Sequence, residues 1–300
     1  MSAIMKHDIR AILGEDFFKD EVRCDYLVTS KMKRVFAVLL DLYMTFAELC
    51  DKHGLRYYVM SGFLLGTIRH QGFIPWDDDL DVAMPREDYN KLMEIAPLEL
   101  DYPYFLRTPY TDPECLYSYI VLMNLSTSFI PIIFKNNNFK KGIPLDIFPL
   151  DYCDLDEYDH DREIIYNHIM RCSTWMKRGC KGLNEKQLKN FEIYHTDNPL
   201  AEWEAIQKIA SNPKYFGSEN LAFSVLTTTD KKHLIFPTKA FEGYIMKPFE
   251  KIKVKVPLGY NKLLDKLYGN WHIYPPINER GIKNTNIIFD SDKPYTDYYD

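Results

Sequence analysis

The 300-residue sequence contains no apolar run that approaches the ~20 residues needed to cross a lipid bilayer. Its first ten residues, MSAIMKHDIR, lack the apolar segment of a secretory signal. The six cysteines include no Cys-x-x-Cys pair, which argues against a structural zinc site and a disulfide framework and favours reduced thiols. These absences together predict a cytoplasmic protein without a transmembrane segment.

A basic surface stripe is also missing. The formal net charge is −6, whereas nucleic-acid binding needs clustered Lys and Arg to displace counterions from phosphates. The densest basic segment, KPFEKIKVK at residues 247–255, has its lysines mostly at every second position. That spacing is typical of the solvated face of a strand, so nucleic acid is not expected as a partner.

Apolar and aromatic residues are plentiful. A hydrophobic content of 46% over 300 residues is enough for a sizeable core. Aromatic residues make up 15% of the chain, with 22 Tyr and 18 Phe. Tyr often lines half-buried surfaces with polar rims, so this excess fits either a wide binding cleft or an aromatic-rich core.

Acidic residues concentrate at the end of the stretch 61–81, SGFLLGTIRHQGFIPWDDDLD. Side chains alternate in direction along a strand, so Asp79 and Asp81 are expected on one face, with Leu80 opposite. Two carboxylates that share a face repel each other, and they suit a hard cation such as Mg²⁺ or Mn²⁺. The pattern predicts a metal-dependent site for phosphoryl chemistry.

The start of the same stretch predicts a phosphate-binding turn. An apolar strand at 56–60 breaks at Ser61 and Gly62, and a short helix is expected over 63–69. Free N–H groups at a helix N-terminus favour anions, and Arg69 could add a charged fork. Ser-Gly before a helix is more often a plain cap, so this interpretation depends on the acids that follow.

A third acid lies inside the apolar run GIPLDIFPLD. The predicted strand 143–150, which we expect to return from a hairpin turn at 135–138, carries Asp146. A carboxylate in such a run is costly unless it is paired or bound to a metal. Asp146 is therefore the natural third ligand, and the alternative is a buried acid that caps a turn or pairs with an arginine. Asp151, beyond the second proline, is expected in a loop or cap.

Periodicity predicts the remaining elements. Apolar residues at three- and four-residue steps predict a core helix over 31–53, with Ser30 as its N-cap and Gly54 as its terminator. Two or three strands are expected within 104–133. Further helices are expected at 85–96, 156–178, 184–194, 199–210 and 259–267, and strand alternation at 244–256.

The order of these features predicts the fold class. A strand, a Ser-Gly turn, a short helix, an Asp-x-Asp strand and a later acidic strand form the layout of a nucleotidyltransferase-like core. We expect an α+β (α/β) fold with a mixed sheet flanked by helices and a largely helical second half. The expected division is a catalytic core at 1–155, a helical acceptor-binding or lid region at 156–240, and a segment at 241–300 that packs back on the core.

Three segments resemble one known family. The stretch SGFLLGTIRHQGFIPWDDDLDVAMPREDY resembles the signature of the LicD family of phosphocholine transferases, to which fukutin-type proteins are related. GIPLDIFPLD is similar to the second block of that family, and residues 249–276 are similar to its C-terminal block. Together these segments fall within residues 31–276.

The resemblance implies a reaction and its partners. A phosphocholine-like group would pass from a CDP-choline-like donor to a hydroxyl of a glycan or lipid-linked sugar, such as a lipopolysaccharide, teichoic acid or capsule precursor, with release of CMP. Mg²⁺, or alternatively Mn²⁺, would be the cofactor. The head group stays open between choline, ethanolamine and a polyol phosphate. Peripheral association with the inner face of the membrane stays open as well.

The resemblance also implies roles for the acids. Asp79 and Asp81 would be metal ligands, and Asp146 would be the third ligand or the general base. Asp77 and Asp78 would support these acids or cap a helix, and joining the metal site is a further alternative.

Seven further residues are candidates for contact with the substrate. Ser61, Gly62 and Arg69 would hold the donor phosphates, and His70 would be an auxiliary phosphate contact or a structural hydrogen-bonding group. A quaternary amine would need an aromatic cage. Trp76, Trp271 and Tyr268 are candidates for it by position, with core packing as the alternative role of each.

Other functions remain open. A plain nucleotidyltransferase would transfer a nucleoside monophosphate to a small molecule and release pyrophosphate. A metal-dependent glycosyltransferase also uses Asp-x-Asp but does not require a third acid on a later strand. A non-catalytic carbohydrate-binding protein would show no Mg²⁺-dependent binding of a cytidine nucleotide.

Overall fold

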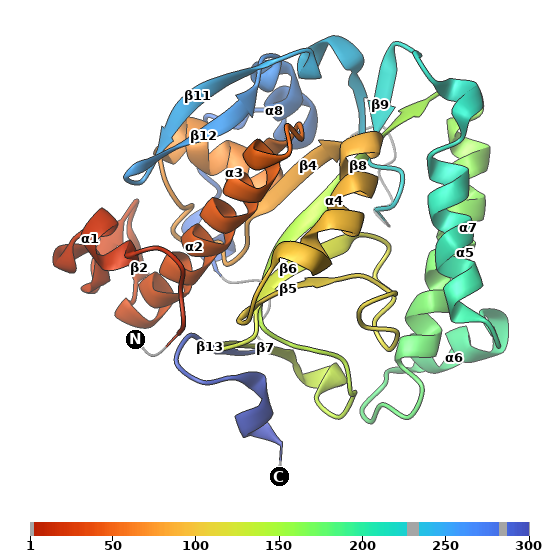
Figure 1. Ribbon diagram of the computed structural model, residues 1–300, viewed down its shortest axis with the longest axis horizontal. Coiled ribbons are helices and arrows are strands. Elements are labelled where there is room, and N and C mark those ends of the chain that lie inside the picture. Colours follow the sequence, from red (N-terminus) through yellow and green to blue (C-terminus); the bar gives the residue numbers. More distant parts are fainter. Residues whose placement is uncertain (1–2, 227–233, 282–286, 300) are drawn as a thin grey trace.

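The core of the protein is a curled, mixed β-sheet flanked by helices (Figure 1). The computed structural model describes residues 3–226, 234–281 and 287–299. Within these residues the main sheet has seven strands, namely β3 (Tyr58–Met60), β4 (Asp81–Pro85), β5 (Tyr104–Arg107), β6 (Ile120–Asn124), β8 (Ile143–Cys153), β9 (Asn220–Ala222) and β10 (Ile235–Pro237). The expected α+β architecture with a mixed sheet is confirmed.

Strand β8 is the centre of this sheet. Along one edge it pairs in parallel with β4, and along the other it pairs antiparallel first with β6 and then with β9. The other pairs of the sheet, β3 with β4, β5 with β6 and β9 with β10, are antiparallel. The strands that carry the predicted acids are therefore direct neighbours.

Two long helices cover the sheet. α2 (Ser30–Lys52) packs on β8 and β6, and α4 (Arg86–Glu99) packs on β8 and β4. The apolar residues of α2 at three- and four-residue steps are buried, including Val35, Phe36, Leu39, Tyr43, Phe46 and Cys50. Burial of one such apolar side chain is worth about 1.5–3 kcal/mol, which explains why the periodicity predicts this helix well.

The ends of α2 differ slightly from the prediction. The N-cap is Thr29, whose hydroxyl accepts a hydrogen bond from the Met32 N–H at 3.2 Å, so Ser30 is the first helical residue instead. Gly54 follows the helix with φ +65°, a left-handed conformation that favours glycine.

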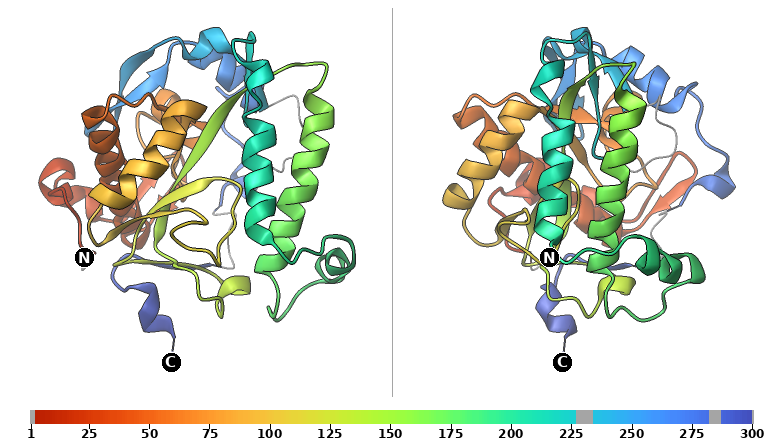
Figure 2. Two further views of the ribbon diagram at one scale, coloured as in Figure 1. Left: turned by 45° about the vertical axis from the view of Figure 1, so that its right-hand side comes forward. Right: turned by 90° about the vertical axis from the view of Figure 1, so that its right-hand side faces the viewer.

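A helical pair lies beside the sheet. α5 (Tyr158–Met176) and α7 (Pro199–Ala210) pack side by side, and α6 (Glu185–Ile193) lies at one end of the pair (Figure 2). These helices agree with the prediction, including Asn198 as the N-cap before a proline. The pair encloses a second apolar cluster that includes Ile165, Ile169, Cys172, Met176, Trp203 and Ile206. The three-part division of the chain stays a prediction, and residues 227–233 and 282–286 of it lie outside the described part.

Smaller elements complete the fold. The hairpin of β11 (Tyr244–Phe249) and β12 (Ile252–Pro257) alternates in burial, in agreement with the predicted strand pattern. The other elements are α1 (Ile9–Leu13), β1 (Glu21–Arg23), β2 (Tyr26–Val28), α3 (Ser61–Leu65), β7 (Ser128–Pro131), α8 (Tyr260–Tyr268) and β13 (Ile287–Asp290). Among the described helices, none is both long and apolar enough to span a bilayer.

Two predictions around β8 are wrong. The segment before residues 135–138 does not form a hairpin with β8, because β7 pairs antiparallel with β13 and both edges of β8 are taken by other strands. Asp151 does not lie in a loop. It belongs to β8 and is fully buried, where it forms an ion pair with Arg86.

Candidate active site

Strand register brings two of the predicted acids together. Asp81 is the direct partner of Asp146 in the parallel pair β4–β8, and the Asp146 N–H donates to the Leu80 carbonyl at 3.1 Å. On the other side, Asp81 pairs with Met60, the residue just before Ser61. Directly paired residues project from the same face of a sheet, so the two carboxyls share one face.

These carboxyls are electrostatically crowded. Burial and then the charge of Asp79 raise the pKa of Asp146 to about 7, while Arg107 and a hydrogen bond from the Tyr119 hydroxyl (3.2 Å) oppose the shift. The pKa of Asp81 is raised well above its usual value, first by burial and then by Asp79, Asp146 and Asp77. Bringing a positive charge among these acids would relieve their repulsion.

The acids just before β4 form a tight group. One carboxylate oxygen from each of Asp77, Asp78 and Asp79 lies within 4.8 Å of the others. Asp78 is only 6% exposed, and its Oδ2 has no hydrogen-bond partner among the described residues. Burial and Asp79 raise the pKa of Asp78 to about 6. Hard oxygen ligands with an unsatisfied buried oxygen among them fit a divalent cation of the Mg²⁺ type.

Gly62 makes room for this acid group. A Cβ atom at position 62 would lie 2.5 Å from Oδ2 of Asp77, which is closer than carbon and oxygen can approach. The close approach of Asp77 therefore requires glycine at position 62, independently of the predicted role of this turn in phosphate binding.

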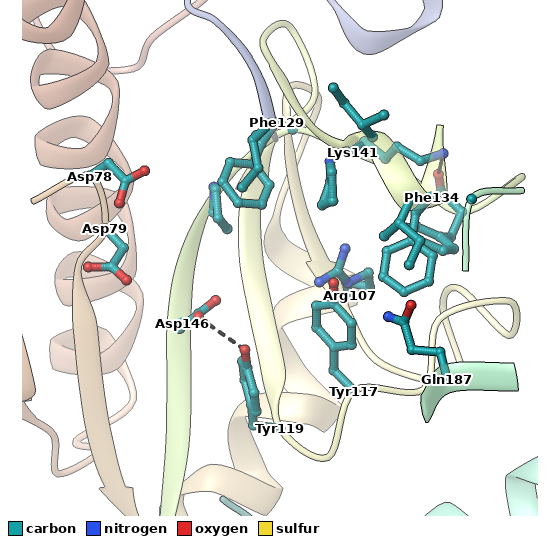
Figure 3. A pocket seen from close by; sticks show the side chains of 18 of the residues that line it. Asp78, Asp79, Arg107, Tyr117, Tyr119, Phe129, Phe134, Lys141, Asp146 and Gln187 are labelled. Atoms are coloured by element: carbon teal, nitrogen blue, oxygen red, sulfur yellow. Dashed lines mark hydrogen bonds between the residues drawn. The ribbon is translucent and has the colours of Figure 1, made fainter. Parts of the chain in front are cut away.

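The acids form one wall of a large cavity. Its volume is about 850 Å³, and Asp78, Asp79 and Asp146 line it together with Tyr119 and Arg107 (Figure 3). A cavity of this size is in the range that holds a nucleotide-sized ligand. The acids thus face a space large enough for a substrate.

Comparison with known proteins agrees with the geometry. Residues 54–152 match the family model described as the LicD/FKTN/FKRP nucleotidyltransferase domain. Over 253 residues the chain is 27% identical to the lipopolysaccharide cholinephosphotransferase LicD of Haemophilus influenzae, with 80% of this chain and 90% of that protein covered. Residues 54–152 thus carry a LicD-type nucleotidyltransferase domain, and most of the chain is similar to a LicD protein.

The matched LicD domain contains all the acids described above. Two uncharacterised Rickettsia proteins are similar over 94 residues, at 50% identity for R. prowazekii and 33% for R. typhi. Each match covers 31% of this chain, and 33% and 28% of the respective proteins.

The Ser-Gly turn directly adjoins the acids. Ser61 begins α3 with φ +48°, an uncommon conformation for a residue with a side chain, and its side chain forms a hydrogen bond with Asp81. α3 continues into a π-helical turn, Gly66–His70. The role of Ser61 and Gly62 in phosphate binding stays a prediction, and the observed contact of Ser61 is with an acid.

Arg69 and His70 contact residues outside the acid group. Arg69 Nη1 donates to the carbonyl of Trp271 at 2.9 Å, and its Nε donates to His70 Nε2 at 3.0 Å. The His70 ring stacks on Tyr274 with a centroid distance of 5.3 Å, and burial and then Arg69 lower the pKa of His70 to about 4. Both residues thus contact the loop after α8 that contains Trp271 and Tyr274. Neither residue lines the 850 Å³ cavity.

Trp76 belongs to the same aromatic group. Its ring makes T-shaped contacts with the rings of Tyr26 and Tyr274. The guanidinium of Arg280 lies 5.0 Å from the centroid of the Trp76 ring. A cation of the chain itself therefore already occupies a face of Trp76. Trp271 is buried and donates its indole N–H to Asp265 at 2.9 Å. Binding of substrate by Trp76 stays a prediction.

Sequence reasoning missed two residues of the cavity. Tyr119 directly precedes β6 and donates to Asp146, and Arg107 ends β5. Neither stands in a motif, and no local signal marks them. Only the pairing of β5, β6 and β8 brings them next to the acids.

Proposed function

We propose that this LicD-family enzyme transfers a phosphocholine-like group from a CDP-activated donor to a hydroxyl of a cell-surface glycan precursor and releases CMP. The observation that carries the proposal is the pairing of Asp81 with Asp146, which lines the 850 Å³ cavity together with Asp79. The similarity to a lipopolysaccharide cholinephosphotransferase over 90% of that protein supports both the transferred group and a lipopolysaccharide-type acceptor.

A divalent cation, Mg²⁺ or alternatively Mn²⁺, is part of the proposal. Asp79, Asp81 and Asp146 would hold it, with Asp77 and Asp78 close enough to take part. When bound, such an ion neutralises charge on the phosphates and polarises the reacting phosphoryl group. The crowding of the carboxyls and the unsatisfied oxygen of Asp78 support the presence of a cation here.

The residues of the chain would guide the proton and the phosphoryl group. Asp146, fixed by the Tyr119 hydroxyl, would accept the proton of the attacking hydroxyl or act as the third ligand. The acceptor oxygen would form a bond to the terminal phosphorus of the donor as the bond to the bridging oxygen breaks. The electron pair of that bond would leave with CMP.

A plain nucleotidyltransferase is the second candidate, because the matched domain carries that name. The products separate the two reactions. Incubation with CDP-choline, Mg²⁺ and a lipopolysaccharide precursor should release CMP and add phosphocholine to the glycan. Release of pyrophosphate from CTP with a small-molecule acceptor, without CMP release from CDP-choline, would favour nucleotidyl transfer.

The decisive experiment pairs this assay with a site variant. Asp81→Asn should release no CMP above the rate without enzyme, whereas Asp101→Asn, at an exposed position, should keep the normal rate. Near-normal CMP release by Asp81→Asn in saturating Mg²⁺ would contradict the proposed site.

A further inference from the structure

A buried arginine lies across the cavity from the acids. Arg107 of β5 pairs with Val121 of β6, and Val121 pairs with Asp146 of β8. Neighbouring strands are about 4.8 Å apart, so the backbones of Arg107 and Asp146 are separated by about 10 Å along one row of the sheet. Paired residues share a face, and in Figure 3 Asp146 lies between Asp79 and Arg107.

Arg107 has no carboxylate partner within the part of the chain that the structure describes. Its side chain is only 8% exposed, and its one hydrogen bond there is from Nη1 to the Lys140 carbonyl at 3.3 Å. Its guanidinium lies 4.6 Å from the centroid of the Tyr117 ring. The charges of Asp112 and Asp146 act on Arg107 only from beyond ion-pair distance. A buried guanidinium without a carboxylate in direct contact is therefore a candidate binding position for an anion.

A second arginine of the same protein gives the contrast. Arg86 is also largely buried, and both of its donor edges are used, with Asp151 and Gln207 as partners. Arg107 instead lines the open cavity together with Lys141. Lys141 is 2% exposed, and its ammonium donates to the carbonyls of Asn137 and Phe139. The cavity thus has an acidic wall and a cationic wall that face each other.

We propose that Arg107 binds the phosphate of the nucleotide that leaves as CMP. This inference rests on the proposed function and adds the residue that holds the leaving group. The donor carries two linked phosphates, and the acids with their cation account for the one that reacts. The other develops negative charge as its bond to the reacting phosphorus breaks, and a planar guanidinium matches two of its oxygens. Tyr117 covers one face of the guanidinium and leaves its edge able to donate.

A phosphate on the acceptor glycan would have the same chemistry. The nucleotide is favoured because Arg107 lies on the same strand row as Asp146 and Asp81, so one diphosphate could contact both walls. The test therefore includes a sugar phosphate as a separate ligand.

The experiment measures CMP binding by calorimetry in EDTA, so that neither turnover nor the cation contributes. Arg107→Met should weaken CMP binding by about tenfold or more, the loss expected for a charge-assisted hydrogen bond. Arg107→Lys, which keeps the charge and the contact with Tyr117, should give a smaller loss. Arg56→Met, an exposed arginine outside this cavity, should bind CMP normally. Circular dichroism checks that each variant is folded. If Arg107→Met does not fold, the CMP affinity of Arg107→Lys decides the test.

The outcomes separate the two proposals. CMP binding that depends on Arg107, without transfer from CDP-choline, supports the role of Arg107 and contradicts the proposed function. Normal transfer with CMP affinity unchanged in Arg107→Met and Arg107→Lys overturns the role of Arg107 and leaves the function standing. Glucose 6-phosphate binding that requires Arg107, in a protein that does not bind CMP, also overturns it.

Discussion

Arg86 and Asp151 form a bidentate ion pair at the end of the β4–β8 pair opposite Asp81 and Asp146. Nε of Arg86 lies 2.6 Å from Oδ1 of Asp151 and Nη2 lies 2.7 Å from Oδ2. Asp151 is fully buried, and Nη1 of Arg86 also donates to Gln207 of α7 at 2.7 Å. One guanidinium therefore connects α4, β8 and α7, while the acids of the site lie at the other end of the same strands.

Removal of one partner of this pair should destabilise the fold strongly. Asp151→Ala leaves the guanidinium buried without its counter-charge, and we expect a loss of about 3–5 kcal/mol in the free energy of unfolding, measured by urea denaturation. The double variant Arg86→Met with Asp151→Leu should recover most of that loss, because it leaves no unpaired charge. A cost below about 1 kcal/mol for Asp151→Ala would contradict this account.

Metal binding should stabilise the native protein through the acid cluster. Addition of Mg²⁺ should raise the melting temperature of the wild type, since a ligand that binds only the folded state increases stability. Asp81→Asn should abolish that increase and lower turnover by about 10²-fold or more. Asp101→Asn should behave like the wild type in both measurements. If Mg²⁺ raised the melting temperature of Asp81→Asn as much as that of the wild type, the cation would bind at another site.

Substitution of Gly62 should damage the site more than the fold. In Gly62→Ala the new methyl group would collide with Oδ2 of Asp77, so this carboxylate must move. We expect weaker Mg²⁺ binding and a turnover lower by about 10-fold or more, while the free energy of unfolding falls by about 1–3 kcal/mol. Gly281→Ala, where a Cβ meets no atom within 4 Å, is the matched control. Unchanged Mg²⁺ affinity in Gly62→Ala would show that Asp77 does not matter for the cation.

Stability should depend on pH through His70. Burial and Arg69 lower its pKa from 6.5 to about 4, so the neutral ring is favoured in the folded state. Between these two values the unfolded chain binds more protons than the folded one. This contribution to stability is therefore complete above pH 6.5 and is lost as the pH falls towards 4.

A variant isolates the effect. His70→Gln should flatten the slope of the unfolding free energy between pH 6.5 and 4, measured by urea denaturation at several pH values. His195→Gln, at an exposed position, should leave the slope unchanged. An unaltered slope in His70→Gln would mean that other groups cause the acid sensitivity.

Local signals in the sequence were enough for much of the fold. The buried stripe of α2 and the Asn198-Pro199 start of α7 follow from contacts within a few residues, so periodicity and capping predict them. The shared face expected for Asp79 and Asp81 stays a prediction, because β4 begins only at Asp81 and Asp79 lies before the strand.

Local signals in the sequence did not predict how the strands pair. The hairpin expected before β8 is absent because β13, far along the chain, pairs with β7. Arg69 looks like a phosphate ligand by its position, yet in the structure it binds the carbonyls of the loop after α8. Arg107 stands in no motif, and it reaches the site because β6 lies between β5 and β8.

The sequence by itself determined the helices, most strands and the chemical character of the site, since these depend on residue type and short-range spacing. Only the tertiary structure decided that Asp146 stands beside Asp81, that Asp151 pairs with Arg86 and that Arg107 faces the acids. The physical reason is that strand register and ion pairing are chosen by contacts between residues distant in the chain, where many partners of the same type compete.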